Sequence, residues 1–148
     1  MVVAAYRALP DGDQLGSYEE VLRDVADRTA QAEVLVAVDD DGAVLGTATY
    51  VPGPGPYAET DDPDEAGIRM LGVAPAAQGR GIGQALVAAC VERARDAGRL
   101  RIGLVSRPSM VQAHRMYERF GFRRSTDRDF EPVPGVTLLG YVLDLNDR

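Results

Sequence analysis

The chain has 148 residues, with 16 Lys and Arg against 23 Asp and Glu, and a formal net charge of −7. This acidic balance argues against nucleic-acid binding, because the phosphate backbone attracts basic surfaces. The sequence has no run of eighteen apolar residues and no basic leader with an apolar core. We therefore expect one soluble, cytoplasmic domain over residues 1–148 that binds neither nucleic acid nor membrane.

The first half of the chain predicts a helix, a hairpin and a long loop. Tyr18 to Arg28 has an amphipathic pattern typical of a helix. Glu33–Val38 and Ala43–Val51 are apolar and joined by three aspartates and a glycine, which predicts an antiparallel hairpin. Pro52 to Glu65 is rich in Pro, Gly and acids and is expected to be a loop.

A strand is predicted over Ile68–Val73, and it contains Gly72. A glycine inside a strand marks a bulge or a close approach of another backbone. Packing against a neighbouring helix is an equally good explanation from the residues alone.

Directly after this strand, Gln78-Gly79-Arg80-Gly81-Ile82-Gly83 leads into a helix. The three glycines permit positive φ, and the first N–H groups of a helix have no internal partner, so the segment suits a diphosphate. It is neither a dinucleotide fingerprint, because Gln84 replaces the third glycine, nor a P-loop, because Gly83 is followed by Gln84-Ala85.

The helix that follows is predicted from Gly81 to Ala97, with Gly98 ending it and a strand from Leu100 to Val105 after it. Such a strand, helix and strand should connect with a right-handed crossover. Cys90 is the single cysteine of the chain and lies on the apolar stripe of the helix, so we expect it to be buried.

Ser109 and Gln112 form a capping box, which predicts a second helix with Ser109 as its N-cap. Ala113, Met116, Tyr117 and Phe120 share one face of this helix, and Gly121 ends it. An alternating final strand is expected over Val136–Leu145.

Two of these segments carry a family resemblance. Gln78 to Gly83 resembles the Gln/Arg-x-x-Gly-x-Gly/Ala signature of the GNAT family of N-acetyltransferases, and Ala113 to Phe122 is similar to the family's closing motif, Ala-x-x-x-Tyr-x-x-x-Gly-Phe. The resemblance covers Glu33 to Leu145. It implies an α/β fold whose mixed sheet is mostly antiparallel, with one parallel pair where the cofactor enters. Family members open with a strand and a helix, whereas Val2 to Arg7 looks like the end of that helix, so the opening strand is expected to be truncated or missing.

The resemblance also implies site residues. The donor would be acetyl-coenzyme A, with Leu71 N–H polarising the thioester, the Val73 backbone holding the pantetheine arm and Tyr117 as general acid. Tyr117 would be a packing residue on spacing alone. Met110 stands where the family often has Asn. The implied cofactor contacts are Leu71, Gly72, Val73, Gln78, Gly79, Arg80, Gly81, Ile82, Gly83, Gln84, Ser109, Met110 and Tyr117.

The resemblance implies direct acetyl transfer to an amine, with a small molecule as the first choice of acceptor, a protein N-terminus or lysine as the alternative, and Glu59 as the first choice of base. A solvated loop acid is the alternative for Glu59, and a non-catalytic acyl-coenzyme A sensor or interaction module is the alternative for the chain. No metal site is expected, because His114 is the only histidine and has no partner pattern. Ser106 and Ser109 lie in no nucleophile elbow, so a hydrolase is unsupported. Family analogy leaves a homodimer open.

Overall fold

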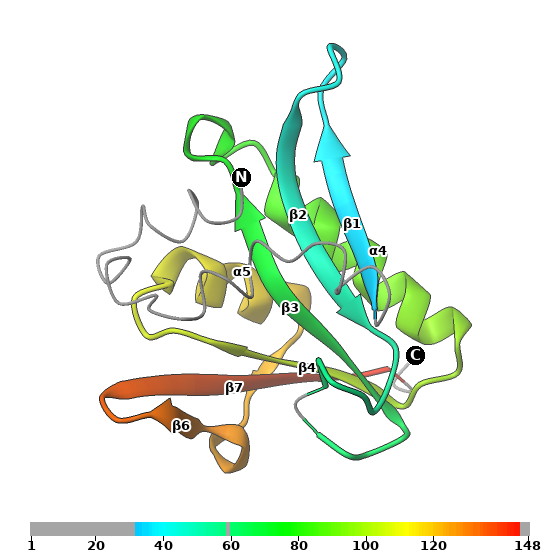
Figure 1. Ribbon diagram of the computed structural model, residues 1–148, viewed down its shortest axis with the longest axis vertical. Coiled ribbons are helices and arrows are strands. Elements are labelled where there is room, and N and C mark those ends of the chain that lie inside the picture. The colour runs from blue at the N-terminus through cyan, green and yellow to red at the C-terminus, as the bar shows by residue number, and fades with distance from the viewer. Residues whose placement is uncertain (1–31, 59, 146–148) are drawn as a thin grey trace.

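The computed structural model describes residues 32–58 and 60–145, so Glu59 and the predicted elements before residue 32 lie outside the described residues. The main elements, drawn in Figure 1, are β1 (Glu33–Val38), β2 (Val44–Val51), β3 (Glu65–Val73), α4 (Ile82–Asp96), β4 (Arg101–Ser106), α5 (Val111–Phe120) and β7 (Val136–Asp144). Shorter elements are η2 (Pro75–Ala77), β5 (Arg123–Arg124), η3 (Thr126–Arg128) and β6 (Phe130–Val133). No helix in this described part is long and apolar enough to cross a membrane.

Within residues 32–58 and 60–145, the strands form a seven-stranded mixed sheet. Its order is β1-β2-β3-β4-β7-β5, and β6 pairs with β7 off this path. The pair β3–β4 is parallel, and the other pairs are antiparallel, so the predicted sheet type is confirmed. The predicted β1–β2 hairpin is also confirmed, with Asp39 Oδ1 accepting the turn N–H groups of Asp41 and Ala43 at 2.9 Å.

The sheet opens between β3 and β4. Pairing in this parallel seam covers three residue pairs and ends at Gly67 and Gly103. On the other side of β3, Thr47 pairs with Gly72 and Thr49 with Arg69, so two β3 residues oppose the single residue Ala48. This is the bulge that Gly72 suggested, and Met70 within it has a φ of 55°. Beyond the seam the two strands diverge, with α5 beside the opening (Figure 1).

The two long helices occupy different parts of the same core. Leu86, Val87, Cys90 and Val91 of α4 pack on β1–β3, where they meet Ala48, Tyr50 and Ile68. Cys90 is fully buried, as predicted. The helix α5 places Tyr117 against Tyr141 of β7, with ring centroids 5.8 Å apart.

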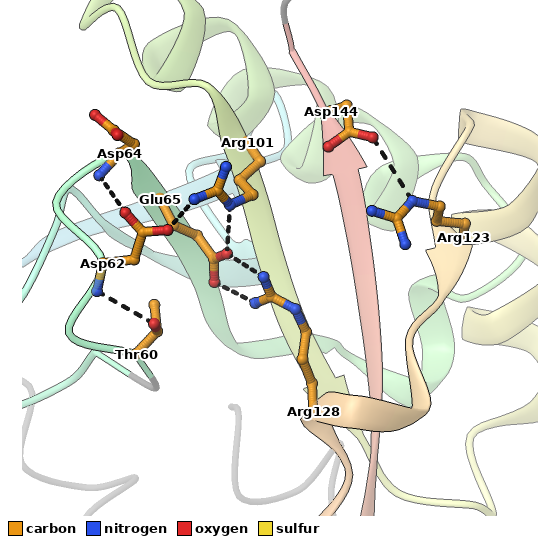
Figure 2. A network of polar contacts seen from close by, with 8 residues as sticks. All are labelled: Thr60, Asp62, Asp64, Glu65, Arg101, Arg123, Arg128 and Asp144. Atoms are coloured by element: carbon orange, nitrogen blue, oxygen red, sulfur yellow. Dashed lines mark hydrogen bonds and ion pairs between the residues drawn. The ribbon is translucent and has the colours of Figure 1, made fainter.

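The start of β3 differs from the prediction. The strand begins at Glu65, three residues before the expected Ile68, and Glu65 is 5% exposed although the sequence placed it in a loop. Arg128 of η3 makes a two-pronged ion pair with Glu65, and Arg101 of β4 makes a second one at 3.3 Å and also contacts Asp62, as Figure 2 shows. Two partners from distant parts of the sequence therefore compensate the buried charge.

The start of α5 also corrects the prediction. The N-cap is Met110, not Ser109, and no side chain caps the helix. The N–H of Met110 donates to the carbonyl of Arg107 at 3.0 Å, so Pro108 and Ser109 are the central residues of a turn. This turn moves the helix start one residue beyond the position that the capping box indicated.

Candidate active site

A cleft lies where β3 and β4 diverge. The bulged part of β3, the end of β4 and two residues at the start and middle of α5 line it. These lining residues are Ile68, Arg69, Met70, Leu71, Leu104, Val105, Ser106, Met110 and Tyr117. The strands no longer pair here, so backbone groups of both strands are available to an extended ligand inserted between them.

The predicted phosphate cradle is the start of α4. Gly81 is the N-cap with φ +77°, and Gly79 has φ +81°. Among the described residues, a Cβ added at either glycine would meet no atom within 4 Å, so the space beside both glycines is open. No acidic side chain lies in the first turn of this 15-residue helix. Free N–H groups, the positive end of the helix dipole and open space together fit a diphosphate.

Gly83 corrects one detail of the sequence interpretation. Its φ is not positive, because Ile82 and Gly83 already belong to the first turn of α4. A Cβ at Gly83 would lie 3.7 Å from Met116 and Val73, which is ordinary van der Waals contact. Only Gly79 and Gly81 therefore need the positive φ that glycine permits, and Gly83 does not.

The polar side chains of the cradle are exposed. Arg80 lies in the turn before the helix, and Gln84 lies in its first turn. Gln78 donates from Nε2 to the carbonyl of Val73 at 3.4 Å, so it contacts the end of β3. This contact links the cradle to the strand whose backbone was expected to hold the pantetheine arm.

Tyr117 lies in the cleft and in the core at once. Its side chain is 3% exposed and packs against Phe122 and Tyr141 at centroid distances of 5.7 and 5.8 Å. Burial raises the pKa of its hydroxyl well above the ordinary 10, so the phenol stays protonated over the whole physiological range. Packing and a site role are therefore compatible for this residue.

The structure brings Leu71, Met110 and Tyr117 together in the cleft lining. Gly72 and Val73 follow on β3, and Ser109 is half-buried in the turn before α5. Glu59, the first choice of base, lies outside the described residues. In residues 32–58 and 60–145, no group of three or more His, Cys, Asp or Glu side chains could hold a metal ion.

Sequence reasoning missed a pair of side chains next to Tyr117. Ser106, at the end of β4, lies with Oγ 3.1 Å from Nε2 of His114 in α5. Ser106 lines the cleft, whereas His114 packs on Tyr141 with ring centroids 5.3 Å apart. A separation of eight residues across a strand end, a turn and a helix start has no characteristic spacing, so the sequence alone offered no signal for this contact.

The opened sheet, the cleft and the helix start together define an acyltransferase architecture. The family model "Acetyltransferase (GNAT) family" matches residues 4–122. The chain belongs to the GNAT family of acetyltransferases, which use acetyl-coenzyme A as the donor.

Among curated proteins, the chain is 31% identical over 124 residues to a mycothiol acetyltransferase of Arthrobacter sp. strain FB24, covering 82% of this chain and 36% of the relative. It is 39% identical over 66 residues to the mycothiol acetyltransferase of Rhodococcus erythropolis, covering 45% of this chain and 22% of the relative. The chain thus spans about a third or less of the length of these curated relatives.

Solved structures share the fold at lower identity. The ribosomal-protein-alanine N-acetyltransferase of Brucella melitensis matches with a TM-score of 0.70 and 22% identity over 97% of this chain and 92% of that chain. The putative acetyltransferase yncA of Salmonella typhimurium, solved with acetyl-CoA, matches with a TM-score of 0.63 and 21% identity over 93% of this chain and 76% of that chain.

Proposed function

We propose that the protein is an N-acetyltransferase that moves the acetyl group of acetyl-coenzyme A to a small-molecule amine by direct attack in a ternary complex. The observation that carries this proposal is the alignment of two features along one path. The opened seam between β3 and β4 ends at Val73, and Gln78 connects that strand end to the cradle at the start of α4. A long donor with a diphosphate at one end and a thioester at the other suits this path.

In this proposal, different residues bind different parts of the donor. The N–H groups at the start of α4 bind the diphosphate, and the backbone of Val73 holds the amide-rich arm. The bulge at Met70 and Leu71 lies in the cleft lining, and in this proposal the Leu71 N–H hydrogen-bonds the thioester carbonyl and the oxyanion that forms on attack. Tyr117 donates a hydrogen bond to the departing sulfur.

The acceptor is proposed from the chemistry alone. Attack needs a neutral amine, and an alkylammonium has a pKa near 10, so a base or a chain of waters must take its proton. The mycothiol acetyltransferases that this chain resembles support acetyl transfer, and the Brucella enzyme is named for a ribosomal protein. A peptide N-terminus is therefore the comparison that any acceptor assay needs.

Thermal unfolding with acetyl-coenzyme A, free coenzyme A and NAD tests the donor site. A ligand at one hundred times its dissociation constant stabilises the folded state by about 2.7 kcal/mol. We expect both coenzyme A species to raise Tm, NAD to leave it unchanged, and Gly81→Asp to abolish the shift because a carboxylate then faces the diphosphate. If millimolar acetyl-coenzyme A leaves Tm unchanged, the transferase proposal fails.

Acceptor screening then separates the enzyme from a non-catalytic sensor. We would measure release of coenzyme A with 2-phenylethylamine, L-phenylalanine methyl ester and a tripeptide with a free N-terminus. Turnover with one of the two small amines supports the proposal. Donor binding without turnover of any amine would favour the sensor.

A further inference from the structure

The reaction needs a group that accepts the proton of the amine. Glu65, at the start of β3, is one acidic candidate, but Arg128 and Arg101 already engage both of its carboxylate oxygens. Its side chain is only 4% exposed, and proton uptake there would break a buried ion pair. Glu65 is therefore a structural residue, and the proton acceptor has to be sought in the cleft itself.

The cleft presents one polar pair of the required kind. Ser106 is 4% exposed and lines the cleft together with Leu71 and Tyr117. Its Oγ lies 3.1 Å from His114 Nε2, within hydrogen-bond distance. A hydroxyl in a cleft with an imidazole behind it is the arrangement in which proteins move a proton from a ligand to a base that does not touch that ligand.

The inference requires one direction of this hydrogen bond, from Ser106 Oγ to His114 Nε2, and the surroundings of His114 favour it. Burial lowers the pKa of His114 below 6.5, and a backbone hydrogen bond with Arg107 opposes the shift. A backbone group that raises a histidine pKa is a carbonyl that accepts a ring N–H. Ser106 Oγ also lies 3.4 Å from Met110 Sδ, a weak acceptor to which it can donate. Because Nε2 faces Ser106, a neutral ring with its proton on Nδ1 lets Nε2 accept the hydroxyl proton of Ser106 in place of the sulfur, and this is the tautomer that the inference requires.

The charged and titratable neighbours of His114 come from three elements. Glu118 of α5 raises its pKa, and Arg124 of β5 lowers it. The Tyr141 ring of β7 packs on the imidazole, and burial raises the pKa of that phenol too. Arg124 is itself paired with Asp129 at 2.7 Å, which offsets its charge. The ring is therefore neutral near pH 7 and able to accept a proton.

We propose that Ser106 and His114 form the proton-accepting pair of the acetyl transfer, with Ser106 as the residue that contacts the acceptor nitrogen and His114 as the base behind it. This inference rests on the proposed function. The step starts from the neutral amine, whose ammonium proton has passed to water. As the N–C bond forms, the nitrogen becomes positively charged, and one of its N–H bonds then breaks with the electron pair staying on nitrogen. Ser106 Oγ takes that proton and passes its own to His114 Nε2.

The rest of the step balances within the same cleft. The C–S bond breaks with its electron pair on sulfur, and Tyr117 stabilises the thiolate by a hydrogen bond. The imidazolium returns its proton through Ser106 to the thiolate, whose pKa resembles that of a cysteine thiol, so the enzyme regains its starting state. Tyr117 need not lose its proton at any stage, which agrees with the raised pKa of that phenol.

NMR of the ring nitrogens of His114 tests the geometry without any acceptor. His114 is the only histidine, so its nitrogen signals are unambiguous. We expect a neutral ring protonated on Nδ1, a pKa below 6.5, and a changed Nε2 signal in Ser106→Ala. A neutral ring protonated on Nε2, or an Nε2 signal that ignores Ser106→Ala, would overturn the proposal.

Kinetics test the role in proton transfer, with the small amine that gives the fastest turnover as acceptor. General bases contribute at least about 10²-fold, so Ser106→Ala and His114→Gln should each lower kcat about 10²-fold, and the double variant little further, because the two act as one unit. The wild-type kcat should fall below the pKa of His114, and His114→Gln should lose this acid limb. Ser125→Ala, a serine away from the cleft, is the matched control.

The outcomes separate this inference from the proposed function. Coenzyme A should raise the Tm of Ser106→Ala as much as that of the wild type, because the donor contacts are elsewhere. Wild-type turnover together with variants within threefold of it, or an unchanged acid limb in His114→Gln, overturns the proton-accepting pair alone. Absence of wild-type turnover overturns the proposed function, whereas the NMR result still decides the hydrogen bond.

Discussion

The phenol of Tyr117 is enclosed by the rings of Phe122 and Tyr141 and still reaches the cleft. Enclosure makes ionisation unfavourable, so we assign Tyr117 the donation of a hydrogen bond and not the loss of a proton. A hydrogen bond to a developing thiolate is a charge-assisted one, which is stronger than a bond to the neutral thioester sulfur. In the proposed reaction this hydrogen bond would therefore stabilise the departing sulfur more than the bound donor.

We predict that Tyr117→Phe lowers kcat about 10- to 100-fold, the effect of removing one charge-assisted hydrogen bond worth about 1.5–3 kcal/mol. The Tm shift with coenzyme A should stay within a degree of the wild-type shift, because the ring still packs. Steady-state kinetics between pH 6 and 9 give the measurement. Unchanged turnover across this range would show that Tyr117 is a packing residue only.

The residues of the site differ in how far the sequence could predict them. Gly79, Gly81 and Tyr117 belong to motifs with fixed spacing, and the structure puts Tyr117 in the cleft and the glycines at the helix start. Ser106 and His114 meet through tertiary packing of β4 against α5, which no local pattern specifies. For this reason, the sequence suggested Glu59 as the proton acceptor and gave no indication of Ser106 and His114.

At the scale of elements, α4 begins with two glycines that have different roles. Gly81 needs its positive φ as the N-cap, whereas Gly83 sits in helical conformation with room for a methyl group. A glycine inside a helix costs roughly 0.5–1 kcal/mol relative to alanine, and a left-handed conformation costs a non-glycine residue roughly 1–2 kcal/mol.

Replacement of each glycine by alanine should therefore change stability in opposite directions. We predict that Gly83→Ala raises the free energy of unfolding by about 0.5–1 kcal/mol and keeps the coenzyme A shift, while Gly81→Ala lowers it by about 1–2 kcal/mol. Urea denaturation of the two variants provides the comparison. A destabilised Gly83→Ala would mean that the methyl group clashes with Met116 or Val73.

Long periodic elements were predicted within a few residues, whereas short or non-local ones were not. The spacing of apolar residues and the glycines after the helices predicted six of the elements close to their observed positions. These are β1, β2, β4, β7, α4 and α5. The strand β6 was missed, because its hydrogen bonds to β7 stabilise four exposed residues that have no buried face of their own. Glu65 was missed for a similar reason, since its burial depends on Arg128, which lies 63 residues away.

At the scale of the whole molecule, the buried ion pairs around Glu65 hold the two parts of the opened sheet together at their closed end. Glu65 begins β3, Arg101 begins β4, and Arg128 reaches across from η3 (Figure 2). A Cβ at Gly103 would lie 2.8 Å from Glu65 Oε2, so β4 passes directly beneath the pair. The network therefore anchors the seam from which the cleft opens.

We predict that Arg128→Met lowers the free energy of unfolding by about 3 kcal/mol, the lower end for breaking a buried pair, because Arg101 still contacts Glu65. Arg123→Met is the matched control, since its ion pair with Asp144 is exposed and exposed pairs are worth about 1 kcal/mol or less. Chemical denaturation in low and high salt gives both values. Equal losses in the two variants would refute an anchoring role for the Glu65 network.

The folded protein should not react with thiol-reactive dyes, because Cys90 is buried. Its side chain is fully buried between α4 and the sheet, and burial raises the pKa of its thiol to about 12, so the reactive thiolate is absent at assay pH. Since the chain has no other cysteine, free coenzyme A released by turnover would be the only thiol that such a dye detects. Cys90 becomes reactive when the core opens, so the rate at which a dye labels Cys90 would report how often the core opens.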